Sequence, residues 1–553
     1  MSTTIKTNAK PVLIMKEGSG ADTVKDSQLN SIAAARAVSE VMKSALGPKG
    51  MDKMLVNKFG DIIITNDGRT ILQEMELQHP VAKMIVDIAR TVDDEVGDGT
   101  TSSVVVAGEL LGKAEELIKK GIHPTIIVEG FQKAAEKALE TLESIAWSVN
   151  VEDEGVLKKI AATSMASKIV SSYKEHLSEI IVSAIFSVEK KVDGKCKVDL
   201  DDVMIEKKLG ESLASTKLIN GIVVTKEVVY PAMPKSVEKA KIALIGSALE
   251  IKKAQFDSKL VIYDPDQVEE LIEQEELIIK GIVDKIAGTG ANVIISGEDL
   301  DKKAHYFLAK KGILTVRRVK KSTMEKLSKA TGGKIITNID IITEKDLGHA
   351  DLVEERCMGG DKMVFVEGCK NPHSVAILIR GANQRIVDEA ERSIHDALCV
   401  VRDVVQEPKI VAGGGAPELE AARAIKKFGI TLTGKEQLAA LSYADALEVV
   451  PRILTENAGL NSIDILPQLR SLHEAGDKWA GMNVLDGKIQ DMKQLEVYEP
   501  LSVKTQIIKS ATEAVSMILS IDEILATGKV KEKPPADKET KEAARQAALN
   551  AMF

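Results

Sequence analysis

The pattern of apolar and polar residues separates the two ends of the chain from its middle. Apolar residues recur every three or four positions over residues 26–46, 81–94 and 384–406, which predicts amphipathic helices. Two short β-rich runs within residues 54–65 predict a hairpin, and a short strand is expected over residues 10–15. Both ends of the chain are therefore expected to be mainly helical.

The middle of the chain has a different pattern, beginning at about residue 221. The clearest unit is a strand over 291–296, a helix over 299–311 and a strand over 313–319. Strands that are joined through helices normally lie parallel, with right-handed crossovers. The predicted fold class is a multidomain protein with α+β and α/β parts.

A long amphipathic segment interrupts this α/β region at residues 264–286. Asp264-Pro265 suits the start of a helix, and Leu271, Ile279 and Val283 recur at helical spacing. From the residues alone, the simplest interpretation is a helix packed on its own sheet.

Length, charge and composition narrow the classes of function. A chain of 553 residues is long enough for three to four domains. A net charge of −9 and an aromatic content of 3% argue against a general nucleic-acid binder. The four cysteines form no C-x-x-C pair, so they are expected to be reduced thiols. Without a signal peptide or a long apolar run, we expect a cytoplasmic protein that does not bind membranes.

A glycine-flanked aspartate, in the segment 96–103, is the first candidate for chemistry. Gly97 and Gly99 allow a ligand to approach the backbone, and the start of a helix suits phosphate oxygens. Asp98 adds a hard oxygen ligand for Mg²⁺. The segment is no Walker A loop. The alternative is an ordinary turn in which Asp98 and Thr100 cap the helix.

Three further loops have similar features. The first predicted helix stops at Gly47-Pro48, an Asn-Asp-Gly turn occupies residues 66–68, and three glycines precede Pro417 in the segment 411–418. Each loop has a purely structural explanation as a turn or a helix start.

Two aspartates in the predicted helix 384–406 are also candidates. Asp396 and Asp403 lie seven positions apart, nearly two turns, so they share a side of the helix. Each is normally a solvated helix charge, and the spacing does not show which one reacts.

The order and spacing of segments 46–53, 65–68 and 97–101 resemble the ATP-binding domain of a group II chaperonin, the family of the archaeal thermosome and its eukaryotic cytosolic relatives. The resemblance implies a mainly helical equatorial ATP-binding domain, a small intermediate domain, and an α/β apical domain with a helical protrusion. It implies these limits: equatorial 1–150 and 405–553, intermediate 151–220 and 373–404, apical 221–372 with the protrusion at about 250–286, and a flexible tail from about 530.

The resemblance also assigns roles to residues. The implied catalytic residues are Asp396, Asp67 and Lys168, and the implied metal ligand is Asp98. Lys168 follows Ala166-Ser167, where the family usually has Thr-Gly. The implied nucleotide-binding residues are Leu46, Gly47, Pro48, Asn66, Gly68, Gly97, Asp98, Gly99, Thr100, Thr101, Ser102, Gly414, Gly415, Met482, Asn483 and Glu499.

The function implied by the resemblance is ATP-dependent protein folding. ATP and Mg²⁺ would be the cofactors, and copies of the chain or paralogous subunits would form a double ring. Non-native polypeptides would be enclosed under a lid formed by the protrusion, with the helix holding His305 to Leu308 as a candidate binding surface. The alternatives are a monomeric ATP-dependent phosphotransferase acting on a small molecule and a ring subunit that has lost hydrolysis.

Overall fold

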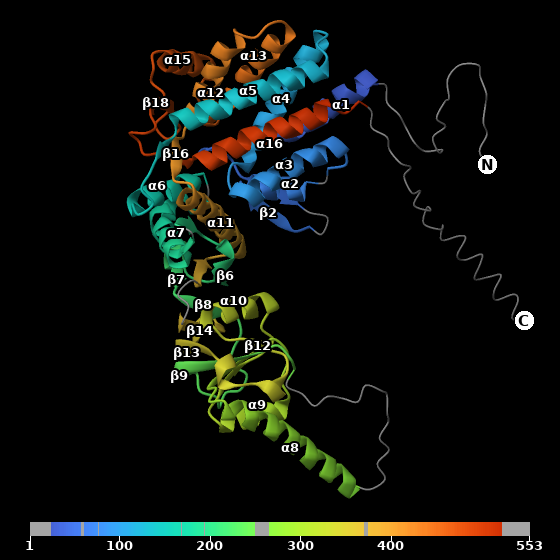
Figure 1. The fold of residues 1–553 in the computed structure, drawn as a ribbon, viewed down its shortest axis with the longest axis vertical. Helices are drawn as coiled ribbons and strands as arrows, with labels where there is room; N and C mark the ends of the chain where they lie inside the picture. Colours follow the sequence, from blue (N-terminus) through green and yellow to red (C-terminus); the bar gives the residue numbers. More distant parts are fainter. Residues whose placement is uncertain are drawn as a thin grey trace, which may run out of the picture.

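The computed structural model describes residues 24–56, 60–75, 77–167, 169–192, 194–248, 265–369 and 374–522. The expected strand at residues 10–15, Lys168, residues 250–264 of the expected protrusion and the tail from about 530 lie outside the described residues. Three hydrophobic cores divide the described residues into bodies that are stacked along the long axis of the molecule (Figure 1). We refer to them as the helical body, the central body and the sheet body.

The helical body is built from both ends of the chain (Figure 1). Helix α4 runs through its core and contacts α1, α3, α5, α13 and α16, which explains the unbroken apolar run that α4 contains. The predicted hairpin is confirmed, because β1 and β2 pair antiparallel. The elements of this body are α1 (Val24–Lys43), β1 (Lys53–Val56), β2 (Ile62–Thr65), α2 (Gly68–Glu74), α3 (Pro80–Val96), α4 (Thr100–Lys119), α5 (Pro124–Ile145), α12 (Ala416–Gly429), α13 (Lys435–Leu447), α14 (Val449–Asn457), α15 (Ser462–Glu474), β17 (Ala480–Asn483), β18 (Lys488–Asp491), β19 (Tyr498–Pro500) and α16 (Leu501–Leu519).

The central body is crossed twice by the chain. The chain enters after α5 through β3 (Trp147–Ser148) and returns through β16 (Lys409–Ala412), and these two strands pair antiparallel. Helix α11 (Gln384–Gln406) has the predicted bounds, and its predicted apolar face is buried. The other elements are α6 (Glu154–Ser164), α7 (Lys174–Val188), β4 (Lys190–Val192), β5 (Lys195–Lys197), β6 (Val203–Leu209), β7 (Lys217–Ile219) and β15 (Val375–Gly381).

The sheet body contains a seven-stranded sheet with the order β11-β10-β9-β13-β14-β8, in which β12 also pairs with β9. The predicted parallel arrangement is confirmed for β10 and β11, and β9 lies parallel to β10 as well. Its elements are β8 (Gly221–Val224), β9 (Ser236–Ile245), α8 (Pro265–Gly288), β10 (Val293–Ser296), α9 (Lys302–Lys310), β11 (Leu314–Val316), α10 (Lys321–Thr331), β12 (Ile335–Ile336), β13 (Gly348–Met358) and β14 (Asp361–Cys369). Among the described helices, none is long and apolar enough to cross a bilayer.

The sequence pattern gave no sign of the antiparallel half of this sheet. Strand β13 contains Glu354, Glu355 and Arg356, which are unfavourable in isolated strands. In the structure, Arg356 donates to both carboxylate oxygens of Glu367 on β14, at 2.6 and 2.9 Å, and lies over the ring of Phe365. Cross-strand pairs therefore stabilise a strand whose local propensity is poor.

Strand β15 joins the central and sheet bodies. All of its residues are buried. Val375, Ile377 and Ile379 belong to the core of the central body, whereas Ala376 and Leu378 belong to the core of the sheet body. Since successive side chains of a strand point to opposite faces, one strand contributes to both cores.

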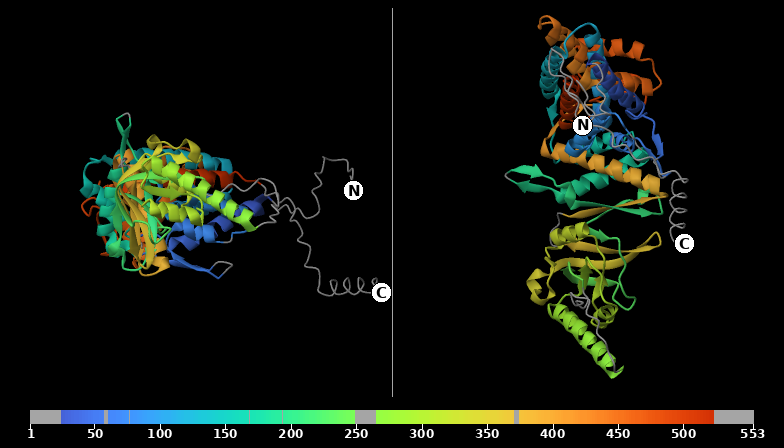
Figure 2. Two further views of the ribbon diagram at one scale, coloured as in Figure 1. Left: turned by 90° about the horizontal axis from the view of Figure 1, so that it is seen from below. Right: turned by 90° about the vertical axis from the view of Figure 1, so that its right-hand side faces the viewer.

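Helix α8 extends beyond the rest of the sheet body (Figures 1 and 2). Near its C-terminal end, Ile279, Val283 and Ile286 are buried in the sheet-body core. Leu277 and Ile278, which directly precede Ile279 on another side of the helix, are 66% and 52% exposed. The interpretation of packing on its own sheet is therefore right for the inner end of the helix, while the outer end projects. The predicted multidomain α+β and α/β fold class is confirmed.

Candidate functional site

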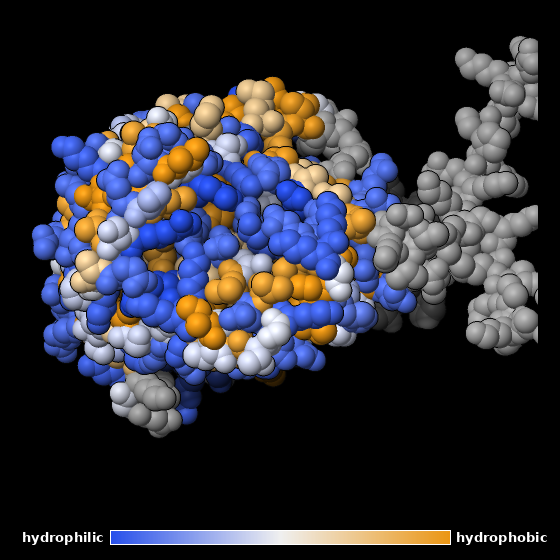
Figure 3. Space-filling model, turned by 90° about the horizontal axis from the view of Figure 1, so that it is seen from above, coloured by the Kyte–Doolittle hydropathy of each residue, from blue (hydrophilic) through white to orange (hydrophobic). Residues whose placement is uncertain are grey.

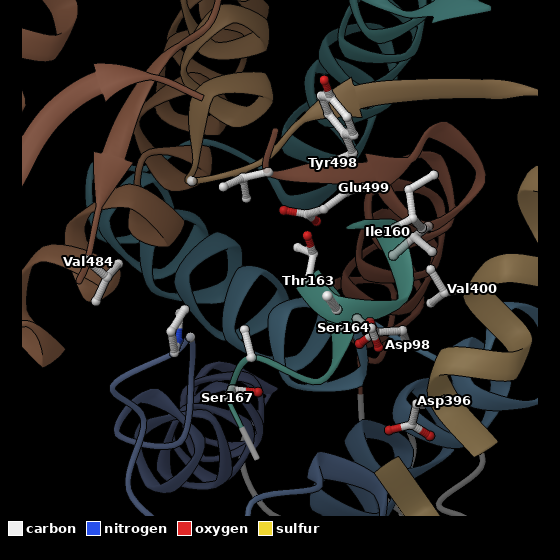
Figure 4. Close-up of a pocket in the computed structure, with 18 of the residues that line it drawn as sticks. Asp98, Ile160, Thr163, Ser164, Ser167, Asp396, Val400, Val484, Tyr498 and Glu499 are labelled. Atoms are coloured by element: carbon white, nitrogen blue, oxygen red, sulfur yellow. The ribbon is translucent and has the colours of Figure 1, made fainter. Parts of the chain in front are cut away.

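A cavity of about 800 Å³ lies between the helical body and the central body (Figure 4). It is lined by most of the residues that the sequence singled out. These are Leu46, Gly47, Pro48, Asn66, Asp67, Gly68, Asp98, Gly99, Thr100, Thr101, Ser102, Asp396, Gly414, Gly415, Met482, Asn483 and Glu499. Gly97 is not among the lining residues, and Lys168 lies outside the described residues.

The turn between α3 and α4 forms one wall of the cavity. Gly97 and Gly99 both have a positive φ, at 70° and 81°. A Cβ on Gly97 would lie 2.3 Å from the Cβ of Cys399 on α11, so this glycine serves the packing of two bodies rather than the cavity. Gly99 is the N-cap residue of α4 and, within the described chain, no side chain caps this helix. The capping alternative is therefore wrong here, and the N–H groups of the first turn of α4 suit an anion.

Asp98 connects this turn to the central body. Its Oδ1 accepts a hydrogen bond from the N–H of Gly99 at 2.6 Å, and its Oδ2 accepts one from the hydroxyl of Ser164 on α6 at 3.0 Å. Figure 4 shows Asp98 beside Ser164, with Asp396 arriving from a different segment of the chain. The carboxylate thus lies where two bodies meet.

Asp67 has a structural task as well as a place in the cavity. It caps α2 by accepting from the N–H groups of Arg69 and Thr70, at 3.3 and 2.9 Å, and from the Thr70 hydroxyl at 2.6 Å. A Cβ on the adjacent Gly68 would lie 2.6 Å from Oγ1 of Thr101, so this turn is pressed against the start of α4. Asn66-Asp67-Gly68 is therefore a helix start, where the sequence suggested a turn, and this segment also lines the cavity.

The second glycine loop opens into the same cavity. Gly414 and Gly415 have positive φ values of 66° and 81°, and Gly415 is the N-cap of α12. A Cβ on Gly415 would lie 2.8 Å from the Cβ of Pro451, which leaves no room for a larger residue. The start of α12, like that of α4, carries no side-chain cap in the described structure. The two helix starts nevertheless differ, because Pro417 has no N–H and the N–H of Ala416 is bonded to the carbonyl of Gly413 at 3.3 Å. The start of α4 therefore supplies the free backbone N–H groups, and the second loop lines the cavity with Gly414 and Gly415.

The structure separates the two aspartates of α11. Both side chains are buried to the same extent, 8% exposed as residues, so the expectation of solvated charges is wrong. Asp396 lines the cavity. Asp403 instead accepts from Arg402 at 2.7 Å and from the Ser502 hydroxyl at 3.4 Å, and burial raises its pKa to about 6. Only Asp396 is placed to meet a ligand.

The sequence interpretation included Glu499 but missed the buried charged cluster to which it belongs, at another wall of the cavity. Lys504 on α16 contacts Glu418 at 2.8 Å and Glu499 at 2.6 Å. Burial alone would lower the pKa of Lys504, but the two carboxylates outweigh it and the pKa is raised. Burial also raises the pKa of Glu499. Glu418 belongs to the glycine-rich motif, but Lys504 sits in an ordinary amphipathic helix and gives no local signal.

The central body contributes lining residues that the sequence also did not reveal. Lys158, Lys159, Thr163 and Ser164, all on α6, face the cavity. Lys159 also forms an ion pair with Glu496, in the segment between β18 and β19. Helix α6 has an ordinary amphipathic pattern, so only its packing beside the cavity shows that these polar side chains can contact a ligand.

The donor groups are compatible with Mg²⁺ bound together with a phosphate ligand. Within the described residues, no group of three or more His, Cys, Asp or Glu side chains could hold a metal ion. Mg²⁺ is usually held by one or two carboxylates together with substrate phosphates and water. A single carboxylate, Asp98, beside the start of α4 meets that requirement.

The sequence of this chain is similar to those of known chaperonins. The model of the TCP-1/cpn60 chaperonin family matches residues 38–529. Thermosome subunit alpha of Archaeoglobus fulgidus is 55% identical over 526 residues, which cover 95% of this chain and 96% of that protein. The thermosome subunit of Methanopyrus kandleri is 51% identical over 519 residues, covering 94% and 95%. Thermosome subunit beta of Sulfurisphaera tokodaii is 52% identical over 533 residues, covering 96% and 97%. The resemblance drawn from the loops is confirmed, and the chain belongs to the TCP-1/cpn60 chaperonin family.

Proposed function

We propose that this chaperonin-family chain is an ATP-dependent protein-folding chaperone that hydrolyses ATP in the cavity between its helical and central bodies. One observation carries the proposal. The uncapped start of α4 and Asp98 lie on one side of the cavity, and Asp396 reaches it from the other body. A phosphate-binding half and a carboxylate suited to activating water thus meet in one place.

The nucleotide-binding half consists of backbone and small side chains. The N–H groups at the start of α4 bind phosphate oxygens, and the Gly414-Gly415 loop lies against the nucleotide. We assign the part of the cavity lined by Met482, Asn483 and Glu499 to adenosine. Asp98 holds Mg²⁺, which neutralises phosphate charge when it is bound.

The hydrolytic half depends on Asp396. Its carboxylate orients or deprotonates the water that attacks the terminal phosphate, assisted by Asp67. General base catalysis of this kind contributes about 10²–10⁴-fold in rate. Lys168 is proposed to contact the terminal phosphate, as the family resemblance implies.

The division of the site suggests how hydrolysis is coupled to movement. A site that is complete only when two bodies close responds to nucleotide by changing their relative position. We assign the helical body to the equatorial domain (1–150 and 405–553), the central body to the intermediate domain (151–220 and 373–404) and the sheet body to the apical domain (221–372). In this assignment α8 is part of a lid that closes over substrate.

Assembly into a ring of like subunits is part of the proposal. The relatives are named as thermosome subunits, two of them as alpha and beta forms, so identical or paralogous subunits are both compatible with this chain. At the end of the helical body, Ile430, Leu438 and Ile463 are exposed. Figure 3 shows apolar patches on this face among hydrophilic residues. Such patches are typical of contacts between proteins.

Substrates are proposed to be non-native polypeptides in the cytoplasm. Tyr306 on α9 is 55% exposed, while its neighbours His305 and Leu308 are buried. Together with exposed Leu277 and Ile278 on α8, it offers apolar surface to an unfolded chain.

The test combines particle size with client protection. Electron microscopy of the purified protein is expected to show rings, and ATP is expected to protect a refolding client from protease. A double variant, L277S/I278S, is expected to weaken capture of the client while ATP hydrolysis continues, because both side chains project from the body. A stable monomer of about the chain mass, 59.7 kDa, would contradict the proposal and favour a phosphotransferase.

A further inference from the structure

A line of hydrogen bonds runs from α11 to the turn that carries Asp67. Oε2 of Glu389 accepts from the Thr65 hydroxyl at 2.9 Å. The same hydroxyl oxygen accepts from the backbone N–H of Asp67 at 3.1 Å. The Thr65 hydroxyl thus donates its proton to Glu389 of the central body and accepts a hydrogen bond from Asp67 of its own helical body.

Both members of the contact between bodies are fully buried. Thr65 is 0% exposed and Glu389 is 1% exposed. A buried carboxylate is costly unless it is paired, and Arg392 donates to Glu389 Oε2 at 2.8 Å. The second oxygen, Oε1, has no hydrogen-bond partner among the described residues. The charge is therefore held at this interface although only half of it is satisfied.

The turn held by this contact has little freedom of its own. Asp67 is fixed at its carboxylate by the start of α2, and Gly68 is pressed against Thr101. The backbone of Thr65 is paired with Lys53 in the β1–β2 hairpin, and its side chain is bonded to Glu389 of the opposite body. A displacement of α11 would consequently move the support of Asp67.

Glu389 and Asp396 lie on the same helix, seven residues apart, so they lie on nearly the same side. A rigid movement of α11 therefore changes the positions of Glu389 and Asp396 together. The movement that brings Asp396 to the cavity also forms the contact between Glu389 and Thr65, which supports Asp67.

We propose that Glu389 is a positioning residue for hydrolysis, acting through the Thr65 hydroxyl to fix the Asp67 turn when α11 docks. This inference rests on the proposed function. It adds to that proposal a residue that does not line the cavity and that acts on Asp67 through Thr65.

The test is a double-mutant cycle on the assembled ring, measured as kcat and KM for ATP. Thr65→Val removes the hydroxyl at nearly constant volume, and Glu389→Ala removes the acceptor. Each is expected to lower kcat about tenfold with KM little changed, because positioning acts on the chemical step. The double variant is expected to be no slower than either single variant, since both substitutions remove the same hydrogen bond between Thr65 and Glu389.

Two further variants separate positioning from general damage. Thr65→Ser retains the hydroxyl and is expected to recover most of the rate. Glu391→Gln changes a neighbouring carboxylate of α11 that pairs with Lys207 at 2.7 Å, and it is expected to leave kcat unchanged. Multiplying effects in the double variant, or an unchanged kcat in both single variants while the unmodified ring hydrolyses ATP, would overturn the inference. A ring without any hydrolysis would instead overturn the proposed function.

Discussion

The two halves of the proposed ATP site are built in different ways. The half in the helical body consists of glycine loops wedged between helices, where an added Cβ at Gly99 or Gly415 would lie 2.8 Å from a neighbouring side chain. The half in the central body consists of side chains on α6 and α11. It is joined to the first half by polar contacts, such as Ser164 to Asp98 and Thr65 to Glu389, and by the packing of Gly97 against Cys399.

This difference indicates which half is preformed. Loops that have no room to move keep their shape with or without a ligand. Helices held across an interface by single hydrogen bonds can separate at modest cost, because each contributes about 1 kcal/mol. We therefore expect nucleotide to bind the rigid half and the other half to close on it.

The largest expected effect comes from removing the proposed metal ligand, Asp98, in the rigid half. Asp98→Ala is expected to weaken Mg²⁺-dependent ATP binding and to reduce hydrolysis about 10³-fold or more, because the phosphate charge is no longer neutralised. Isothermal calorimetry with and without Mg²⁺ and a phosphate-release assay would measure both. Unchanged Mg²⁺-dependent binding would show that the rigid half does not depend on Asp98.

A second prediction concerns the contact between the halves at Gly97. Gly97→Ala is expected to destabilise the protein by about 1–2 kcal/mol from its left-handed backbone and by about 1–3 kcal/mol more from the clash with Cys399. Gly121→Ala is the matched control: its φ is 81°, but no described atom lies within 4 Å of the added Cβ. Urea midpoints would compare the two. Equal losses would mean that the bodies are not pressed together at Gly97.

The smallest effect concerns Asp403 on α11, which does not line the cavity and is bonded to Arg402 and Ser502. Burial raises its folded-state pKa to about 6 from an ordinary 3.8, so the folded protein takes up a proton as pH falls through this window. Its contribution to stability is present below pH 4 and is lost as pH rises through 6. Relative to the unmodified protein, Asp403→Asn is therefore expected to gain up to about 3 kcal/mol between pH 4 and pH 8.

Thermal unfolding across that pH range would measure the gain. Asp87→Asn, an exposed carboxylate on α3, controls for the removal of one charge. A pH-independent difference between Asp403→Asn and the unmodified protein would contradict the assigned environment of Asp403.

The sequence predicted those parts of the site that depend on local backbone chemistry. The glycines that precede helix starts at 97–100 and 413–416 are recognisable in the sequence, since few residue types other than glycine adopt a positive φ. Lys504 and Glu389 could not be found in this way, because each occupies an ordinary position in an amphipathic helix. Their roles come from what the fold places beside them.

The same distinction applies to the fold. Strands β9, β10 and β11 were predictable because buried parallel strands are continuously apolar. Strand β13 was not, since its charged residues are stabilised by partners that only the fold supplies. Arg356 pairs with Glu367 on β14, and Glu355 accepts from the N–H of Val228 and pairs with Lys235. Asp396 and Asp403 were indistinguishable by spacing, and only the docking of α11 against the helical body separates them.

The most direct test of a divided site is to measure ATP binding and ATP hydrolysis on Asp396→Ala in the same preparation. The variant is expected to bind ATP with Mg²⁺ as tightly as the unmodified ring, because the rigid half is intact, while hydrolysis falls about 10²–10⁴-fold. Hydrolysis within a few fold of the unmodified ring would contradict the account, as would loss of binding in step with hydrolysis.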